Sequence, residues 1–256
     1  LVLTLLLYGP SLSGQVGRSP ASPRVGVVLP PAHHDPALSL RLLGALARAE
    51  PDRLEWRLSL AREATTLGIT AGTSEGRKEA LRAGVEAGRE AVARAAEDAD
   101  AHYWLAASLG LLTDEEGGRT KISLAREAYV EARRALELSP DHPGAHHILG
   151  RLHAGTVRLS WLSRMIARGL GLGAIVDDAS LESAEEHLRH AFDADPGPLV
   201  HAFELAKLLV ETGEGPEEGR ALLEELAARR SRYPLDTHYI RRAAALLASV
   251  RTEGGR

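Results

Sequence analysis

A pattern of sixteen residues that occurs four times constrains the fold of this chain more than any other feature of its sequence. The pattern is clearest at residues 135–150, which read ALELSPDHPGAHHILG. The sequence is typical of the end of one helix, a turn that contains Pro140 and Pro143, and the start of a second helix. Segments in the same register occupy residues 46–61, 91–106 and 191–206.

Small residues and turn residues recur at fixed positions of this pattern. Each copy begins with a small or apolar residue: Leu46, Ala91, Ala135 and Ala191. The turn follows five residues later, at Pro51, Ala96, Pro140 and Pro196. Further small residues lie fifteen residues after the start, at Ala61, Ala106, Gly150 and Ala206, and seven before it, at Ser39, Gly84, Ala128 and Ala184. Small residues on one side of a helix allow a neighbouring helix to approach closely, so antiparallel helix pairs should stack on one another.

The repeats predict an all-α, right-handed α-solenoid of about four helix pairs with a C-terminal capping helix. Only 4% of the residues are aromatic, which also favours packed helices over a β-sandwich. The expected helices are residues 36–49, 52–67, 75–96, 99–112, 121–138, 142–155, 159–169, 181–194, 197–212, 216–230 and 235–250. We expect Gly68 and Gly213 to end the helices that precede them.

The N-terminal residues are expected to precede the folded domain. Residues 1–13 combine a short apolar run, a Gly-Pro break and small residues, which indicates a truncated signal peptide. A buried segment of the fold or a membrane anchor are the alternatives. Residues 14–34 read as a disordered linker, and residues 35–252 as the repeat domain. Three lysines against 28 arginines favour a bacterial source. Together with the predicted signal peptide, this source leads us to expect an exported protein in the periplasm or at a membrane.

Composition removes several classes of function. The net charge of −4 gives no general electrostatic reason for nucleic-acid binding. The chain has no cysteine, which excludes a disulfide framework and a thiolate zinc site. It also lacks a nucleophile elbow, a phosphate-binding glycine loop and a helical His-Glu-x-x-His motif. We therefore expect no enzyme activity and no cofactor, with a metal-dependent enzyme as the least favoured alternative.

The repeats resemble tetratricopeptide repeats, whose unit has about 34 residues. Successive copies here are 45, 44 and 56 residues apart, so extra residues must lie between the helices of a pair. Three segments, HYWLAASLG from His102, HHILGR from His146 and LSWLSRMIA from Leu159, resemble the regulator of microtubule dynamics family in order and spacing. The most specific part is the insert with Ser160, Trp161 and Leu162, and the resemblance covers residues 53–247.

This resemblance implies a non-catalytic scaffold that binds a protein or peptide on its concave face. Members of the family are attached to membranes and some are credited with phospholipid binding, so a phospholipid-binding or membrane-associated module is the main alternative. Family geometry places six residues in the presumed groove: Tyr103, Ala107, His147, Arg151, Phe203 and Lys207. Aromatic rings beside two cations suit an extended peptide or an acidic, partly apolar ligand. Alternatively, these side chains pack against the capping helix or the insert.

The insert and the histidines each allow two interpretations. Residues 157–175 are amphipathic and basic, which suits either an interfacial helix on anionic lipid or a segment packed into the solenoid through Trp161. We expect the packed arrangement. His142 and His146 lie one turn apart, as do His187 and His190, and each pair could in principle share a metal ion. We expect these histidines to have structural roles and predict no metal site.

Overall fold

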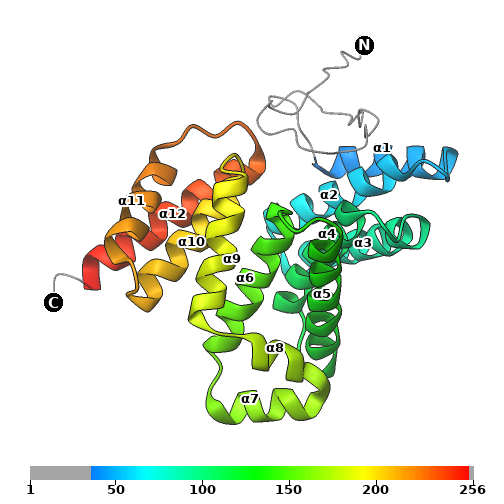
Figure 1. Ribbon diagram of the computed structural model, residues 1–256. Helices are drawn as coiled ribbons and strands as arrows, with labels where there is room; N and C mark the ends of the chain where they lie inside the picture. Colours follow the sequence, from blue (N-terminus) through cyan, green and yellow to red (C-terminus); the bar gives the residue numbers. More distant parts are fainter. Residues whose placement is uncertain (1–35, 254–256) are drawn as a thin grey trace.

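The computed structural model describes residues 36–253, and none of these residues forms a strand (Figure 1). The main helices are α1 (Pro36–Ala49), α2 (Leu54–Thr70), α3 (Ser74–Arg94), α4 (Ala99–Glu115), α5 (Gly118–Leu138), α6 (Pro143–Val157), α9 (Leu181–Ala194), α10 (Leu199–Thr212), α11 (Pro216–Ala228) and α12 (Pro234–Glu253). Between α6 and α9 lie α7 (Trp161–Ala167), the π-helical turn η2 (Arg168–Leu172) and α8 (Gly173–Asp178). The predicted signal peptide and linker lie outside the described residues.

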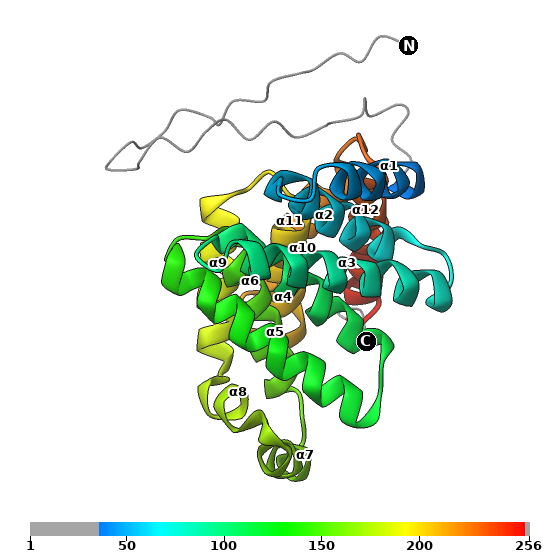
Figure 2. The ribbon, with the colours of Figure 1, turned by 90° about the vertical axis from the view of Figure 1, so that its right-hand side faces the viewer.

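The helices stack in chain order into a solenoid. Each main helix packs against the next, and α2, α4, α6 and α10 also contact one another in sequence. These four helices form an inner row, and α3, α5, α9 and α11 are their outer partners (Figures 1 and 2). The predicted all-α, right-handed solenoid of about four helix pairs is confirmed.

The small residues of the repeat lie where neighbouring helices meet. Ala61, Ala106 and Ala206 are fully buried in the inner helices, as are Ala91 and Ala135 in the outer ones. At the remaining inner position, a Cβ on Gly150 would lie 2.7 Å from Cγ of Leu188 in α9. Such a contact is closer than carbon atoms tolerate, so the spacing of α6 and α9 requires glycine.

Two expected helix ends have different outcomes. Gly213 ends α10 in the left-handed conformation with φ 77°, as predicted. Gly68 was expected to end α2 but lies inside it, because the helix continues to Thr70. The physical reason for glycine there is packing, since a Cβ would lie 2.5 Å from Cγ of Leu81 in α3.

The last helix does more than cover the end of the array. α12 packs on α10 and α11, contacts α2 and lines one cavity together with the inner helices, so it crosses the concave face and joins the last part of the solenoid to the first. Its apolar side, which includes Tyr239, Ala243 and Leu247, is buried. None of the helices in the described range is long and apolar enough to cross a membrane.

Candidate binding site

A central cavity of about 840 Å³ lies between the inner helices and α12. The inner helices and α12 all contribute to its wall, with Thr65 from α2, Tyr103 from α4, His147 from α6, His201 from α10 and Tyr239 from α12. The cavity therefore depends on the solenoid and on the return of α12 across its concave face.

Four of the six predicted groove residues line this cavity: Tyr103, Ala107, His147 and Arg151. Lys207 lines an adjoining cavity of about 350 Å³, and Arg151 and Tyr239 belong to the walls of both. The structure thus brings five of the six residues to one continuous region. Whether this region binds a ligand stays a prediction.

Phe203, the sixth residue, lies beneath α12. It is only 2% exposed, and its ring centroid lies 5.6 Å from that of Tyr239. The guanidinium carbon of Arg242 lies 4.5 Å from the same ring. The alternative interpretation, packing against the capping helix, therefore holds for Phe203. The repeat register placed this residue on the concave face, but register alone does not reveal that α12 covers it.

The aromatic side of the cavity is held rigidly. A Cβ on Gly144 would run into the ring of Tyr103, so glycine is needed at the start of α6. The Tyr103 ring also lies 4.6 Å from Trp104 and 4.8 Å from His142, measured between centroids. Burial raises the pKa of Tyr103 and raises that of Tyr239 to about 12, so both phenols are neutral at pH 7.

Charged groups give the cavity wall a mixed character. Arg151 lies 3.3 Å from the carboxylate of Asp114 and 3.8 Å from that of Glu204, at the junction of the two cavities. Elsewhere on the wall, His142 Nε2 lies 3.1 Å from Asp100 Oδ1. His142 Nδ1 accepts a hydrogen bond from the backbone N–H of Ala145, so this histidine caps α6.

Two buried histidines face each other in the cavity wall. The Nδ1 atoms of His147 and His201 are 3.1 Å apart. One ring must donate and the other must accept across this distance, so the accepting ring is neutral. Burial lowers the pKa of His147 well below its usual value and that of His201 to about 4. These rings therefore act as neutral polar groups at pH 7.

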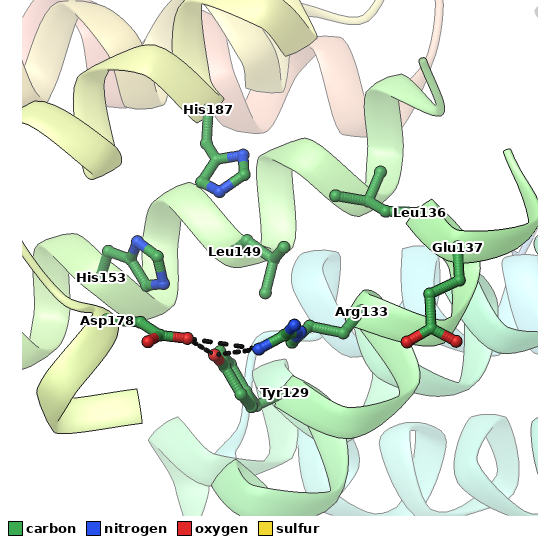
Figure 3. Close-up of a pocket in the computed structure, with 8 residues that line it drawn as sticks. All are labelled: Tyr129, Arg133, Leu136, Glu137, Leu149, His153, Asp178 and His187. Atoms are coloured by element: carbon green, nitrogen blue, oxygen red, sulfur yellow. Dashed lines mark hydrogen bonds and ion pairs between the residues drawn. The ribbon is translucent and has the colours of Figure 1, made fainter. Parts of the chain in front are cut away.

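A second group of histidines lies on the outer side of α6, and two of them, His153 and His187, line a cavity of about 420 Å³ (Figure 3). His146 Nε2 donates to the carbonyl of Pro140, so its Nδ1 must accept from His187 Nδ1 at 2.7 Å. The ring of His190 stacks on that of His146 at 3.8 Å. Sequence reasoning paired histidines within one helix, whereas the structure pairs them between α6 and α9.

The histidines are not arranged as a metal site. Within residues 36–253, no group of three or more histidines and carboxylates is placed to hold a metal ion. Near the same cavity, Tyr129 donates a hydrogen bond to Asp178, and Arg133 lies 3.3 Å from that carboxylate (Figure 3). These contacts join α5 to α8, so this polar cluster fixes the insert to the solenoid.

Because the histidines on the outer side of α6 are partly buried, we expect acid to destabilise the protein. Burial, followed by the neighbouring imidazoles, lowers the pKa of His187 from 6.5 to about 4. The unfolded chain then binds more protons than the folded chain between these pH values, so the free energy of unfolding should fall as the pH falls from 6.5 to 4. The slope from this residue cannot exceed about 1.4 kcal/mol per pH unit, because one histidine releases at most one proton.

Urea unfolding across this pH range measures the effect. The variant His187→Gln should show a smaller loss of stability on acidification, because glutamine does not titrate. An unchanged slope in His187→Gln would contradict the prediction.

The three residues of the insert that carry the family resemblance lie at the start of α7. Ser160 caps this helix by accepting a hydrogen bond from the backbone N–H of Ser163 at 3.2 Å. Trp161 and Leu162 are 75% and 61% exposed. The expectation that Trp161 packs into the solenoid is therefore wrong. α7 packs chiefly on η2 and α8, so none of the repeat helices covers its outer face.

The glycine-rich segment after α7 also has a structure that differs from the expected one. The sequence predicted one helix followed by a loop, whereas the chain continues through the turn η2 into α8. Gly171 has a φ of 91°, which other residues rarely adopt, and this glycine allows the chain to reverse. Ile175 and Val176 of α8 are buried, so they anchor the returning chain.

Stacked antiparallel helix pairs with small residues at their contacts, surrounding a concave cavity, define a protein of the tetratricopeptide-repeat class. A solved structure of a thermophilic protein of this class from Thermus thermophilus has the same fold, with a TM-score of 0.55 and 19% identity over 83% of this chain and 91% of that one. The chain belongs to the family described as regulator of microtubule dynamics protein 1-3, whose model matches residues 32–251.

The chain is similar in sequence to two named members of this family from cattle. It is 33% identical over 167 residues to regulator of microtubule dynamics protein 3 of Bos taurus, covering 63% of this chain and 34% of that protein. It is 29% identical over 157 residues to protein 1 of the same species, covering 61% of this chain and 48% of that protein. The chain thus spans between a third and a half of the length of these two relatives.

Proposed function

We propose that this chain is a non-catalytic scaffold that binds a short segment of a partner protein in its central cavity. The observation that carries the proposal is the 840 Å³ cavity on the inner helices, where four predicted groove residues meet. Ligand pockets of drug-sized molecules occupy roughly 300–1,000 Å³. The cavity is therefore suited to a few consecutive side chains of a peptide and is too small for a folded domain.

The wall is mostly apolar but carries several polar groups, and this mixture favours a peptide over the acyl chains of a lipid. The aromatic ring of Tyr103 and the aliphatic part of Ile148 share this wall with Arg62, Asp195 and Thr65. An acyl chain would cover such polar groups without offering a hydrogen bond, which costs free energy. A peptide has a hydrogen-bond donor and an acceptor on each residue, so it can form hydrogen bonds with the polar groups of the wall. This mixture supports a peptide ligand with an apolar anchor and polar flanks.

The contacts among the ionisable groups support a binding role rather than catalysis. His142 pairs with Asp100, His147 pairs with His201, and Arg151 lies between two carboxylates. These groups hold each other in fixed positions and build a rigid wall. Rigid polar groups give specificity to a binding site because the free protein is already arranged to receive its ligand.

Selection of peptides from a displayed random library against the purified protein tests the proposal. Selected peptides should bind the variant Tyr103→Ala at least about tenfold more weakly, since truncation of a buried aromatic contact costs more than about 1.4 kcal/mol. The variant Tyr103→Phe keeps the ring and should retain most of the affinity. Titration of the intrinsic tryptophan fluorescence with each peptide measures the dissociation constants.

The matched control is Tyr233→Ala, because this tyrosine is 37% exposed and precedes α12. It should leave peptide affinity unchanged. Equal binding by folded Tyr103→Ala and wild-type protein would overturn the proposal, as would a failure to select any peptide that competes for the cavity. The exported location, in a bacterial periplasm or at a membrane, stays a prediction because it rests on residues 1–13, outside the described range.

A further inference from the structure

The largest group of exposed apolar side chains lies on the insert and has no role in the central cavity. Of the ten large apolar side chains that are exposed in the described residues, six fall between residues 159 and 170. We call them the insert face: Leu159, Trp161, Leu162, Met165, Ile166 and Leu170, which are 40%, 75%, 61%, 45%, 54% and 45% exposed. Soluble proteins rarely leave such a group uncovered, so the insert face requires a partner.

The insert face is held in place by the fold. Arg164 Nη2 donates to the carbonyl of Val157 at 2.5 Å, and Arg168 Nη2 lies 2.6 Å from Asp177 Oδ1. The turn at Gly171 returns the chain to α8, which is fixed by buried Ile175. α7 therefore projects at one end of the molecule, away from the stacked helix pairs, where a flat surface can reach it (Figures 1 and 2).

Positive charge surrounds this apolar group. Arg158, Arg164 and Arg168 flank it, and residues 142–176 contain no aspartate or glutamate. Arg158 and Arg168 pair with Glu211 and Asp177 at the edges of the insert, yet the side chain of each remains 43% exposed. The insert therefore combines an exposed tryptophan, aliphatic side chains and bordering arginines. The aliphatic stems of the arginines can extend toward a polar layer, so this combination matches the interface of an anionic bilayer.

We propose that the insert face docks this protein on the surface of a membrane that contains anionic phospholipid. α7 has seven residues and is about 10 Å long at 1.5 Å per residue. A stable protein interface usually draws about 20–30 residues from each side, far more than the insert face offers to a second copy or to another protein. A bilayer adapts to a small protrusion, and its anionic headgroups attract the exposed arginines at the edge of the insert. The proposal does not depend on a ligand in the central cavity.

Sedimentation of the full chain with vesicles tests this docking. The protein should sediment with vesicles of phosphatidylcholine and phosphatidylglycerol, more weakly with phosphatidylcholine alone, and less as salt increases. The double variant Trp161→Ala, Ile166→Ala should bind the anionic vesicles at least about tenfold more weakly, because it removes apolar area that enters the interface. The emission of wild-type protein should shift to shorter wavelength on binding, and Trp161→Phe should abolish that shift.

Leu38 and Leu42 on α1 provide the matched control, since they are 44% and 50% exposed and lie outside the insert. The double variant Leu38→Ala, Leu42→Ala should bind vesicles as the wild type does. Tyr103→Ala should also bind normally, which separates this proposal from peptide binding in the cavity. Undiminished vesicle binding by the insert variant would overturn the proposal. So would a dimer that forms without lipid and dissociates in that variant.

Discussion

Replacing Phe203 by alanine is expected to lower the free energy of unfolding by about 3–5 kcal/mol, the usual cost of truncating a buried phenylalanine. The ring lies among Ala206, Leu223 and Tyr239, where α10, α11 and α12 meet. Removal of the ring leaves a cavity at this junction and deprives Arg242 of the aromatic face beneath it. The loss should therefore include a weaker attachment of α12.

Urea unfolding monitored by circular dichroism measures this loss, and Phe203→Leu provides the control. Leucine fills most of the volume, so that variant should lose less than about 1.5–2 kcal/mol. If Phe203→Ala weakens peptide binding, the effect should follow the displacement of α12, because Phe203 is buried beneath that helix. A stability loss below about 1 kcal/mol would show that Phe203 is not a core residue.

Replacing Gly88 by alanine is the second substitution with a large expected effect. A Cβ at this position of α3 would lie 2.9 Å from Cα and 3.0 Å from Cβ of Leu105 in α4. The closest atom belongs to the backbone, so no side-chain rotation removes the clash and the two helices must separate. We expect the free energy of unfolding to fall by about 1–3 kcal/mol, the usual cost of overpacking a core.

Gly110→Ala is the matched control, since no atom lies within 4 Å of a Cβ added at this position inside α4. Because alanine favours a helix over glycine by about 0.5–1 kcal/mol, this variant should be as stable as the wild type or more stable. Thermal and urea unfolding of both variants measure the difference. Equal stability of the two variants would contradict the close approach of α3 and α4.

Much of the fold was predictable because the repeat constrains it locally. Small residues at fixed spacing, as at Ala106 and Ala206, mark the contacts between helices, and Pro140 marks a turn. The same register predicts Tyr103, His147 and Arg151 on one surface, and all three line the central cavity. These predictions depend only on the geometry of a helix and on the order of the helices along the chain.

The remaining features depend on contacts that local patterns do not encode. α12 lies across the concave face and buries Phe203. The position of α12 depends on the path that the chain takes after α11. The pairing of His146 with His187 likewise joins residues from two helices. Trp161 looked like a core residue because aromatic residues usually are, yet the insert leaves the repeats after α6 and returns to them only past Gly171.

The contact between α12 and α2 also changes how the molecule should unfold. In an open array of repeats each unit touches only its neighbours, so the terminal units can fray while the centre stays folded. Here a helix from the last part of the chain touches one from the first part, so fraying at either end must also break the contact with the other end. Hydrogen exchange should therefore find α2 and α10 protected to a similar extent, as in a cooperative ring rather than a line.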